Sequence, residues 1–272
     1  MSSAPAGAGT PLALRTVQAT RYVTPLREGG SVPAIMEADD DGLYVVKLRG
    51  AAQGPKALIA ELLAGEIGRT LGLPVPEIVL LDLDPALARG EPDPELQIPL
   101  RASAGLNLAL DYLPGSITYD PLVRPAVDAA LASAVVWFDS YVTNVDRTPR
   151  NPNLLLWHKR LWLIDHGAAL YFHHTWADWA ARARSPFVAI RDHVLLRQAR
   201  VLADSTATLA PRLTPAVLDG IIQAIPDGWL TGETTFPDPA ATRAAYLAYL
   251  TARLDAAPIF VEEAIRARAE SL

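Results

Sequence analysis

With 272 residues, 50% of them hydrophobic and 20% charged, the chain has the composition of a packed globular protein rather than a disordered one. Its formal net charge is −6, so nucleic acid is not expected as its main partner, because phosphate contacts need a basic face. The absence of cysteine excludes disulfides, thiolate nucleophiles and cysteine-based zinc sites.

The N-terminal stretch lacks both the basic and the apolar segment of a secretory signal, and we predict a disordered tail over residues 1–12. The longest apolar stretch, around residues 129–138, is far shorter than the roughly 18 residues of a membrane span. We therefore expect a cytoplasmic protein without a membrane partner.

The part of the chain over residues 13–113 predicts β structure around one helix. Residues of the helix are identified by apolar side chains that recur at helical spacing. The predicted strands are 15–24, 33–37, 43–49, 77–83 and 106–112, and the predicted helix is 56–71. Residues 84–99, rich in Pro and Asp, are predicted to form a loop.

The remainder, residues 114–272, predicts helices around a small hairpin. An apolar helix at 122–141 precedes a polar loop and two hairpin strands, 153–157 and 161–164. Further helices are predicted near 176–184, 190–204, 214–224, 239–256 and 258–270. This order indicates an α+β fold of two lobes, a small β-rich N-lobe (13–113) and a mostly helical C-lobe (114–272) that carries the hairpin.

Two carboxylates and an amide flank the predicted hairpin. Asp146 and Asn151 precede its first strand, and Asp165 follows its second. An antiparallel pair brings these two ends together, so we expect the three side chains to converge. Carboxylate and amide oxygens suit Mg²⁺, and phosphoryl transfer also needs an Asp that orients the acceptor hydroxyl. Asn153 is a rival for the amide ligand, and such residues are also ordinary turn formers.

Lysine is rare in this chain: only Lys47, Lys56 and Lys159 occur among 24 basic residues. Lys47 stands in an apolar predicted strand, where a chance surface charge is less expected. Because an ammonium is a compact point charge and a guanidinium a planar fork, this position is a candidate for a functional lysine.

The motifs DRTPRN at 146–151 and IDHG at 164–167 resemble the catalytic and metal loops of HipA-like kinases, and they are also similar to the phosphatidylinositol kinase branch of the protein-kinase-like superfamily. This resemblance implies a two-lobed kinase fold with ATP and Mg²⁺ as cofactors. It implies that Asp146 orients the acceptor, while Asn151 and Asp165 hold the metal.

The resemblance extends upstream of these motifs. It implies that Lys47 pairs the phosphates and that Glu61, on the predicted helix, pairs with Lys47. Further implied nucleotide contacts are Gly29, Gly30 and Ser31 in a phosphate-covering loop, and Leu110, Asp111 and Tyr112 at the hinge that holds adenine.

The sequence favours an ATP-dependent phosphotransferase that modifies a hydroxyl on a protein or a small molecule. All the key polar residues are present, which supports turnover. The glycine loop, however, lacks the full G-x-G-x-x-G pattern. A nucleotide-binding sensor or scaffold without turnover is therefore the alternative.

A second phosphate-binding pattern fails on spacing. Residues 50–56 follow a strand and open a helix, but a phosphate loop needs four residues between its glycines, and this segment has three. Lys56 remains a candidate for holding phosphates or substrate.

The basic stretch formed by Arg182, Arg184 and Arg191 is most simply a solvated face. If it lines the cleft, we expect it to bind an acidic or phosphorylated substrate, because guanidinium groups pair with carboxylates and phosphates.

Overall fold

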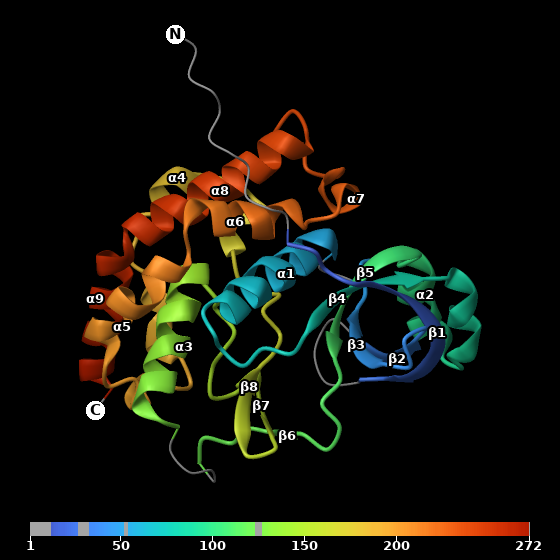
Figure 1. Cartoon of the computed structure of the whole chain (residues 1–272), viewed down its shortest axis with the longest axis horizontal. Helices are drawn as coiled ribbons and strands as arrows, with labels where there is room; N and C mark the ends of the chain where they lie inside the picture. The colour runs from blue at the N-terminus through green and yellow to red at the C-terminus, as the bar shows by residue number, and fades with distance from the viewer. Residues whose placement is uncertain (1–11, 27–32, 52–53, 123–126, 272) are drawn as a thin grey trace.

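The computed structural model describes residues 12–26, 33–51, 54–122 and 127–271. A β-barrel forms the N-terminal part of these residues, and the C-terminal part is mostly helical, which confirms the predicted α+β class (Figure 1). The strands are β1 (Thr16–Pro25), β2 (Ala34–Ala38), β3 (Leu43–Lys47), β4 (Ile78–Leu83), β5 (Gly105–Asp111), β6 (Ile117–Thr118), β7 (Leu154–Trp157) and β8 (Arg160–Leu163). The α-helices are α1 (Gly54–Thr70), α2 (Pro94–Ala102), α3 (Ala129–Val142), α4 (Trp179–Arg182), α5 (Leu202–Leu209), α6 (Pro215–Gln223), α7 (Asp227–Leu230), α8 (Pro239–Asp255) and α9 (Ala257–Glu270).

The barrel has the strand order β1-β2-β3-β5-β4 and closes through a parallel pair of β1 with β4, while the other pairs are antiparallel. Side chains alternate across each strand, so Tyr44 and Val46 of β3 point into the barrel core. Lys47, the next residue, points to the outside, where it faces α1. The pleat thus places this lysine outside the barrel.

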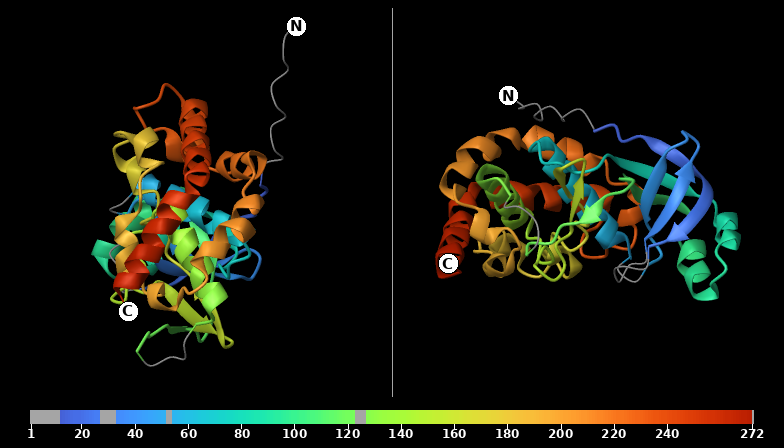
Figure 2. Two further views of the ribbon diagram at one scale, coloured as in Figure 1. Left: turned by 90° about the vertical axis from the view of Figure 1, so that its left-hand side faces the viewer. Right: turned by 90° about the horizontal axis from the view of Figure 1, so that it is seen from below.

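Helix α1 is apolar on almost every side, and an unbroken run from Leu58 to Gly68 is buried. A helix of this kind is expected in an interior rather than on a surface. It contacts β4 and β5 of the barrel and also α6 and α7 (Figure 1). Its side chains belong to the core of the helical region, whereas the barrel interior forms a separate core. Helix α1 therefore joins the barrel, at one end of the molecule, to the helices at the other (Figure 2).

The predicted hairpin is present, with Leu154 opposite Leu163 and with β6 added as a short third strand. Helix α3, which precedes it, begins later than predicted. Its N-cap is Asp128, whose carboxylate accepts the N–H groups of Ala130 and Leu131 at 2.9 and 3.1 Å.

The prediction of one N-terminal helix and of a loop over 84–99 is wrong. A 3-10 helix, η1 (Pro85–Gly90), and then α2 occupy this segment. Asp84 and Asp93 cap them, each followed by Pro at the first helical position, which is a helix-start signal that the loop-like composition concealed. Ala88 and Leu100 of these helices contribute to the barrel core.

The predicted bounds of the helices near 176–184 and 190–204 are also wrong. Only α4 lies in the first range, and the second contains the 3-10 helices η3 (Val188–Asp192) and η4 (Leu196–Gln198) before α5 begins. The chain breaks at His193 because this side chain bonds a buried carboxylate and because the Val194 N–H donates to Arg147 O at 3.0 Å. The 3-10 helices η2 (Tyr171–His174) and η5 (Ala210–Arg212) and the short helix α7 were not predicted.

The predicted tail, residues 1–12, lies outside the described residues except for Leu12. That residue is held in place: its N–H donates to Gly220 O of α6 at 3.2 Å, and its side chain packs against the helical core. Among the helices in the described ranges, none combines the length and apolar character that a membrane crossing requires.

The importance of α1 packing can be tested with Leu63→Ala, because Leu63 is fully buried in the helical core. We expect the free energy of unfolding to fall by about 2–5 kcal/mol, from lost apolar burial and the cavity that remains. Leu122→Ala is the matched control, since Leu122 is 93% exposed, and it should change stability by less than about 0.5 kcal/mol. Urea unfolding measures the free energy of unfolding of both variants, and equal losses of stability would contradict the buried packing of Leu63.

Candidate functional site

A buried carboxylate anchors the loop that follows α3. Asp139, fully buried, accepts a hydrogen bond from Arg147 Nε at 2.6 Å, from Asn144 Nδ2 at 3.0 Å and from His193 Nε2 at 2.9 Å. The other ring nitrogen of His193 accepts the Leu195 N–H at 3.0 Å, so Nε2 carries the proton. Burial favours the neutral acid, but Arg147 and His193 outweigh it and hold the pKa of Asp139 well below its usual range.

The Arg147 guanidinium also ties this loop to the hairpin. Its Nη1 donates to Asn153 O at 2.5 Å and to Ile164 O at 3.3 Å. These two residues are neighbours across the hairpin, since Ile164 N–H donates to Asn153 O at 3.1 Å. One buried side chain therefore fixes the residues before β7 and after β8 relative to Asp139.

Asp146 and both candidate amides converge in this loop. The Asp146 Oδ2 accepts from Asn151 Nδ2 at 2.7 Å and from Asn153 Nδ2 at 3.2 Å. Asn151 is exposed, and the described residues give its Oδ1 no partner. Asn153 is buried, and its backbone is held by Arg147. The geometry therefore favours Asn151 as the accessible oxygen ligand.

Lys47 and Asp165, 118 positions apart in the sequence, meet in an ion pair of 2.6 Å between Nζ and Oδ1. The lysine is largely buried, whereas 39% of the aspartate side chain is exposed. Asp165 has a φ of 55°, in the left-handed region that Asp adopts more readily than most residues. Strained backbone of this kind is concentrated at functional sites.

Glu61 lies beside this pair but does not contact Lys47 as the resemblance implied. Its Oε1 instead accepts from His166 Nδ1 at 3.2 Å, and both side chains are buried. Because a carboxylate can only accept, Nδ1 carries the proton. The Glu61 Oε2 and the His166 Nε2 have no hydrogen-bond partner among the described residues.

The charges of this group stabilise each other. Burial lowers the pKa of Lys47, but the carboxylates of Glu61 and Asp165 outweigh that effect and raise it above its usual value. For Glu61, burial raises the pKa, and the Lys47 charge and the His166 hydrogen bond lower it more, to about 2. Glu61 is therefore ionised at neutral pH.

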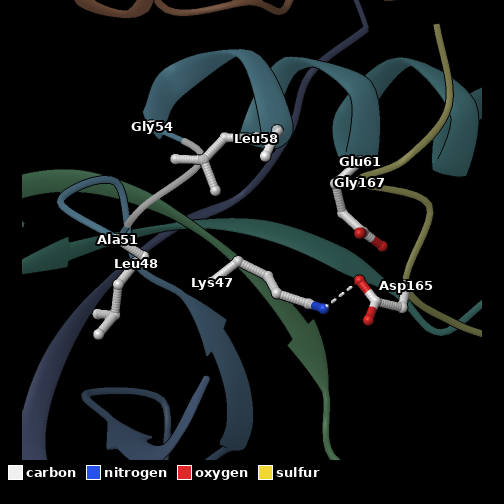
Figure 3. Close-up of a pocket in the computed structure, with 9 residues that line it drawn as sticks. Lys47, Leu48, Ala51, Gly54, Leu58, Glu61, Asp165 and Gly167 are labelled. Carbon is white, nitrogen blue, oxygen red and sulfur yellow. Dashed lines mark hydrogen bonds and ion pairs between the residues drawn. The ribbon is translucent and has the colours of Figure 1, made fainter. Parts of the chain in front are cut away.

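A small cavity opens between β3, α1 and the loop after β8, and Lys47, Glu61 and Asp165 point into it (Figure 3). Its volume of ≈ 30 Å³ is far below the roughly 300–1,000 Å³ of ordinary ligand pockets. Leu48 and Leu58 add an apolar wall.

The hinge residues do not line this cavity. Leu110 is buried in the helical core, and the N–H groups of Asp111 and Tyr112 already donate to the carbonyls of Glu77 and Leu43, both at 2.9 Å. The donors expected for adenine are thus engaged within the barrel. Gly29, Gly30 and Ser31 lie outside the described residues.

Lys56 does not line this cavity and is engaged by other protein groups. Its Nζ donates to His173 O at 2.6 Å and pairs with Glu233 at 2.9 Å, so it holds the chain that follows the loop at 164–167. Residues 54–56 of the phosphate-loop pattern open helix α1, and residues 52 and 53 lie outside the described residues.

The donor set fits Mg²⁺ shared with phosphates. No group of three or more His, Asp or Glu side chains that could hold a metal occurs in the described ranges. Asp165 offers a partly exposed carboxylate, and Asn151 retains a free amide oxygen. Mg²⁺ is commonly held by one or two protein ligands together with phosphate oxygens and water.

Four residues of the site had no role in the sequence prediction: Asp139, Arg147, His166 and His193. The signal for Asp139 was an acidic residue inside an apolar helix, which is costly without a partner. The partner His193 carries no local signal, because 54 residues separate it from Asp139.

The chain is similar to a family of known proteins and to several solved structures. A model of the HipA-like kinase family matches residues 20–256. The crystal structure of the Helicobacter pylori proinflammatory kinase CtkA is similar over 88% of this chain and 95% of its own, with a TM-score of 0.53 and 16% identity. Two crystal structures of the Golgi casein kinase, one with Mn/ADP bound, cover 94% of this chain and 74% of theirs, with TM-scores of 0.47 and 0.49 and identities of 14% and 12%. Among curated proteins, no match was found.

The barrel followed by a helical region is a kinase-like fold, similar to that of a crystallised kinase. Within that fold class, the chain belongs to the HipA-like kinase family. The resemblance drawn from the motifs at 146–151 and 164–167 is thereby confirmed, and the family supports a kinase-type phosphotransferase.

The charge of Glu61 can be tested through pH. A carboxyl whose pKa is lowered on folding stabilises the fold above its unfolded value, and this contribution is lost as pH falls to the folded value, here from about 4.5 to about 2. Glu61→Gln should therefore be less stable than wild type at neutral pH, and this difference should shrink across that range. Urea unfolding at each pH measures it. Glu262→Gln, at an exposed site on α9, is the matched control, and a difference independent of pH would contradict the assignment.

Proposed function

We propose that this protein is an ATP-dependent, Mg²⁺-dependent phosphotransferase that transfers the γ-phosphate to a hydroxyl group. The observation that carries the proposal is the 2.6 Å pair between Lys47 of β3 and Asp165 after β8, beside Glu61. It brings a phosphate-pairing cation and a metal-binding carboxylate to one point, as phosphoryl transfer requires. In this proposal the barrel with α1 is the N-lobe (13–113), and residues 114–272 are the C-lobe.

Asp146 orients the acceptor hydroxyl and receives its proton. Its side chain is already oriented by Asn151 and Asn153, and that preorganisation is a large part of what such a residue contributes. Asn151 and Asp165 would hold Mg²⁺, which neutralises charge on the phosphates. Gly29, Gly30 and Ser31 are proposed to cover the phosphates, and the Leu110–Tyr112 segment to border the adenine.

Lys47 and Glu61 form the second half of the proposed site. When Asp165 is engaged by metal, the Lys47 ammonium is free to meet phosphate oxygens. The unpartnered Oε2 of Glu61 is then available to hold it, since the carboxylate lines the same cavity. Before that exchange, the hydrogen bond from His166 Nδ1 keeps the Glu61 carboxylate in position.

The alternative is a nucleotide-binding sensor or scaffold without turnover. Two observations favour it: Glu61 pairs with His166 rather than with Lys47, and the glycine loop lacks the full G-x-G-x-x-G pattern. Both proposals place the protein in the cytoplasm with ATP as ligand. They differ in whether a phosphate is transferred to a protein or small-molecule acceptor.

Nucleotide binding is the first test. ATP with Mg²⁺ at about 100 times its Kd should stabilise the fold by about 2.7 kcal/mol, because it binds only the folded state. Thermal unfolding measures the rise in Tm, with ATP plus EDTA as the control for the metal. Asp165→Ala should reduce the Mg²⁺-dependent part of this rise. No rise at millimolar ATP–Mg²⁺ would remove both proposals.

Transfer separates the two proposals. Asp146→Asn keeps the size of the side chain, so nucleotide binding should persist, while transfer to protein acceptors should fall by about 10²–10⁴-fold. Phosphoproteomic mass spectrometry of the protein and of a cell lysate incubated with labelled ATP measures it. Asp41→Asn, at an exposed turn, is the matched control. Full activity in Asp146→Asn would show that the role assignment is mistaken, and an inactive wild type that binds ATP would favour the sensor.

A further inference from the structure

A large pocket with a cationic lining lies next to the loop that carries Asp146. Its volume is ≈ 570 Å³, and its walls come from residues 148–150, from residues 191–197 and from Ser271. Arg150, Arg191 and Arg197 line it, against one acidic residue, Asp192. Of the basic stretch identified in the sequence, only Arg191 contributes, since Arg182 and Arg184 are not among the lining residues.

These arginines are available to a ligand. Arg150 and Arg197 are exposed, and neither has a hydrogen bond or ion pair to another side chain in the described part of the chain. Arg191 approaches Asp192 only at 3.9 Å, with both side chains largely exposed, which is a weak pair. The pocket therefore keeps an excess of positive charge, although the chain as a whole is acidic.

The walls of the pocket are held by the same contacts that hold the catalytic loop. The Thr148 N–H donates to the carbonyls of Asp146 and Asn151, both at 3.0 Å. The opposite wall is fixed by two hydrogen bonds. The Val194 N–H donates to Arg147 O, and His193 Nε2 donates to the Asp139 carboxylate. Both ring nitrogens of His193 are used in this way, so its role in the pocket is structural.

The pocket is within reach of an acceptor at Asp146. Arg150 is four residues from Asp146, so their Cα atoms are at most about 15 Å apart. An extended peptide advances about 3.3 Å per residue, so a group in the pocket lies within about five residues of the acceptor hydroxyl. Guanidinium groups bind carboxylates and phosphates through paired, charge-assisted hydrogen bonds.

We propose that this pocket binds a carboxylate or phosphate group on a peptide acceptor, within about five residues of the hydroxyl that is phosphorylated. The inference rests on the proposed transferase function and narrows its acceptor to a protein segment with an acidic or phosphorylated residue. The pocket then supplies substrate specificity, while Asp146 supplies the chemistry.

The test uses serine and threonine peptides that carry one Glu or one phosphoserine at each position from five before to five after the acceptor, with matched Gln peptides. At the best position, the acidic peptide should be phosphorylated at least about tenfold faster than its Gln match, the scale of a charge-assisted hydrogen bond. Arg150→Ala combined with Arg197→Ala should bring this ratio close to one. The ratio is internal to each variant, so a general loss of folded protein cancels.

Two further variants sharpen the result. Arg197→Glu should shift the preference from Glu to Lys at the same position. Arg184→Ala, which removes an exposed arginine outside the pocket, should keep the wild-type ratio. An acidic preference that survives in the double variant, or a wild type that transfers phosphate without any acidic preference, would overturn the proposal.

A binding measurement makes the outcome independent of transfer. Fluorescence anisotropy of a labelled phosphoserine peptide should give a Kd at least about tenfold lower than that of its Gln match, and the double variant should lose the difference. If ATP fails to bind, the transferase proposal fails, and this measurement still decides whether the pocket binds the anion. Equal Kd values for the two peptides, or competition by phosphatidylinositol phosphate vesicles that bind more tightly than the phosphopeptide, would overturn it.

Discussion

The functional end of this molecule depends on one buried ion pair, between Asp139 of α3 and Arg147. A lone carboxylate inside an apolar helix would be strongly destabilising, and removing one partner of such a pair costs about 3–5 kcal/mol. The partners come from the loop and from His193, distant in sequence, so satisfying one charge organises both segments. Arg147 extends the effect to the hairpin, because it also binds the carbonyls of Asn153 and Ile164. Asp146 and Asp165 therefore derive their relative positions from Arg147, which follows Asp146 in the chain and binds the carbonyl of Ile164, the residue before Asp165.

The other half of the site depends on helix α1. This helix is buried against the barrel on one side and against the helical region on the other, and it carries Glu61 to the cavity that Lys47 lines at the end of β3. The contact of Lys47 with Asp165 and that of Glu61 with His166 then form one charged cluster between the two parts of the chain. In this cluster Lys47 is satisfied by the residue proposed for the metal, so the proposed binding of nucleotide would require an exchange of partners rather than the approach of distant groups.

The arginine pocket connects to the same network through Val194 and His193. Its position explains how an acidic protein can present a local cationic surface: the charges are concentrated on two segments that the buried ion pair fixes, while the net charge remains −6. A local excess of this kind directs an acidic ligand to one place, which a uniformly basic surface would not do.

The sequence by itself determined the α+β class, the barrel strands, the hairpin and the family, because these follow from short periodicities and from two motifs with fixed spacing. It also brought Asp146 and Asn151 together, since hairpin pairing is local. Tertiary structure alone decided that Lys47 meets Asp165, that Glu61 binds His166, and that Arg150 and Arg197 share a pocket with Arg191. These contacts join segments up to 118 positions apart. Their partners are chosen by the packing of α1 and by the need to satisfy the buried charge of Asp139, and no local pattern in the sequence identifies those partners.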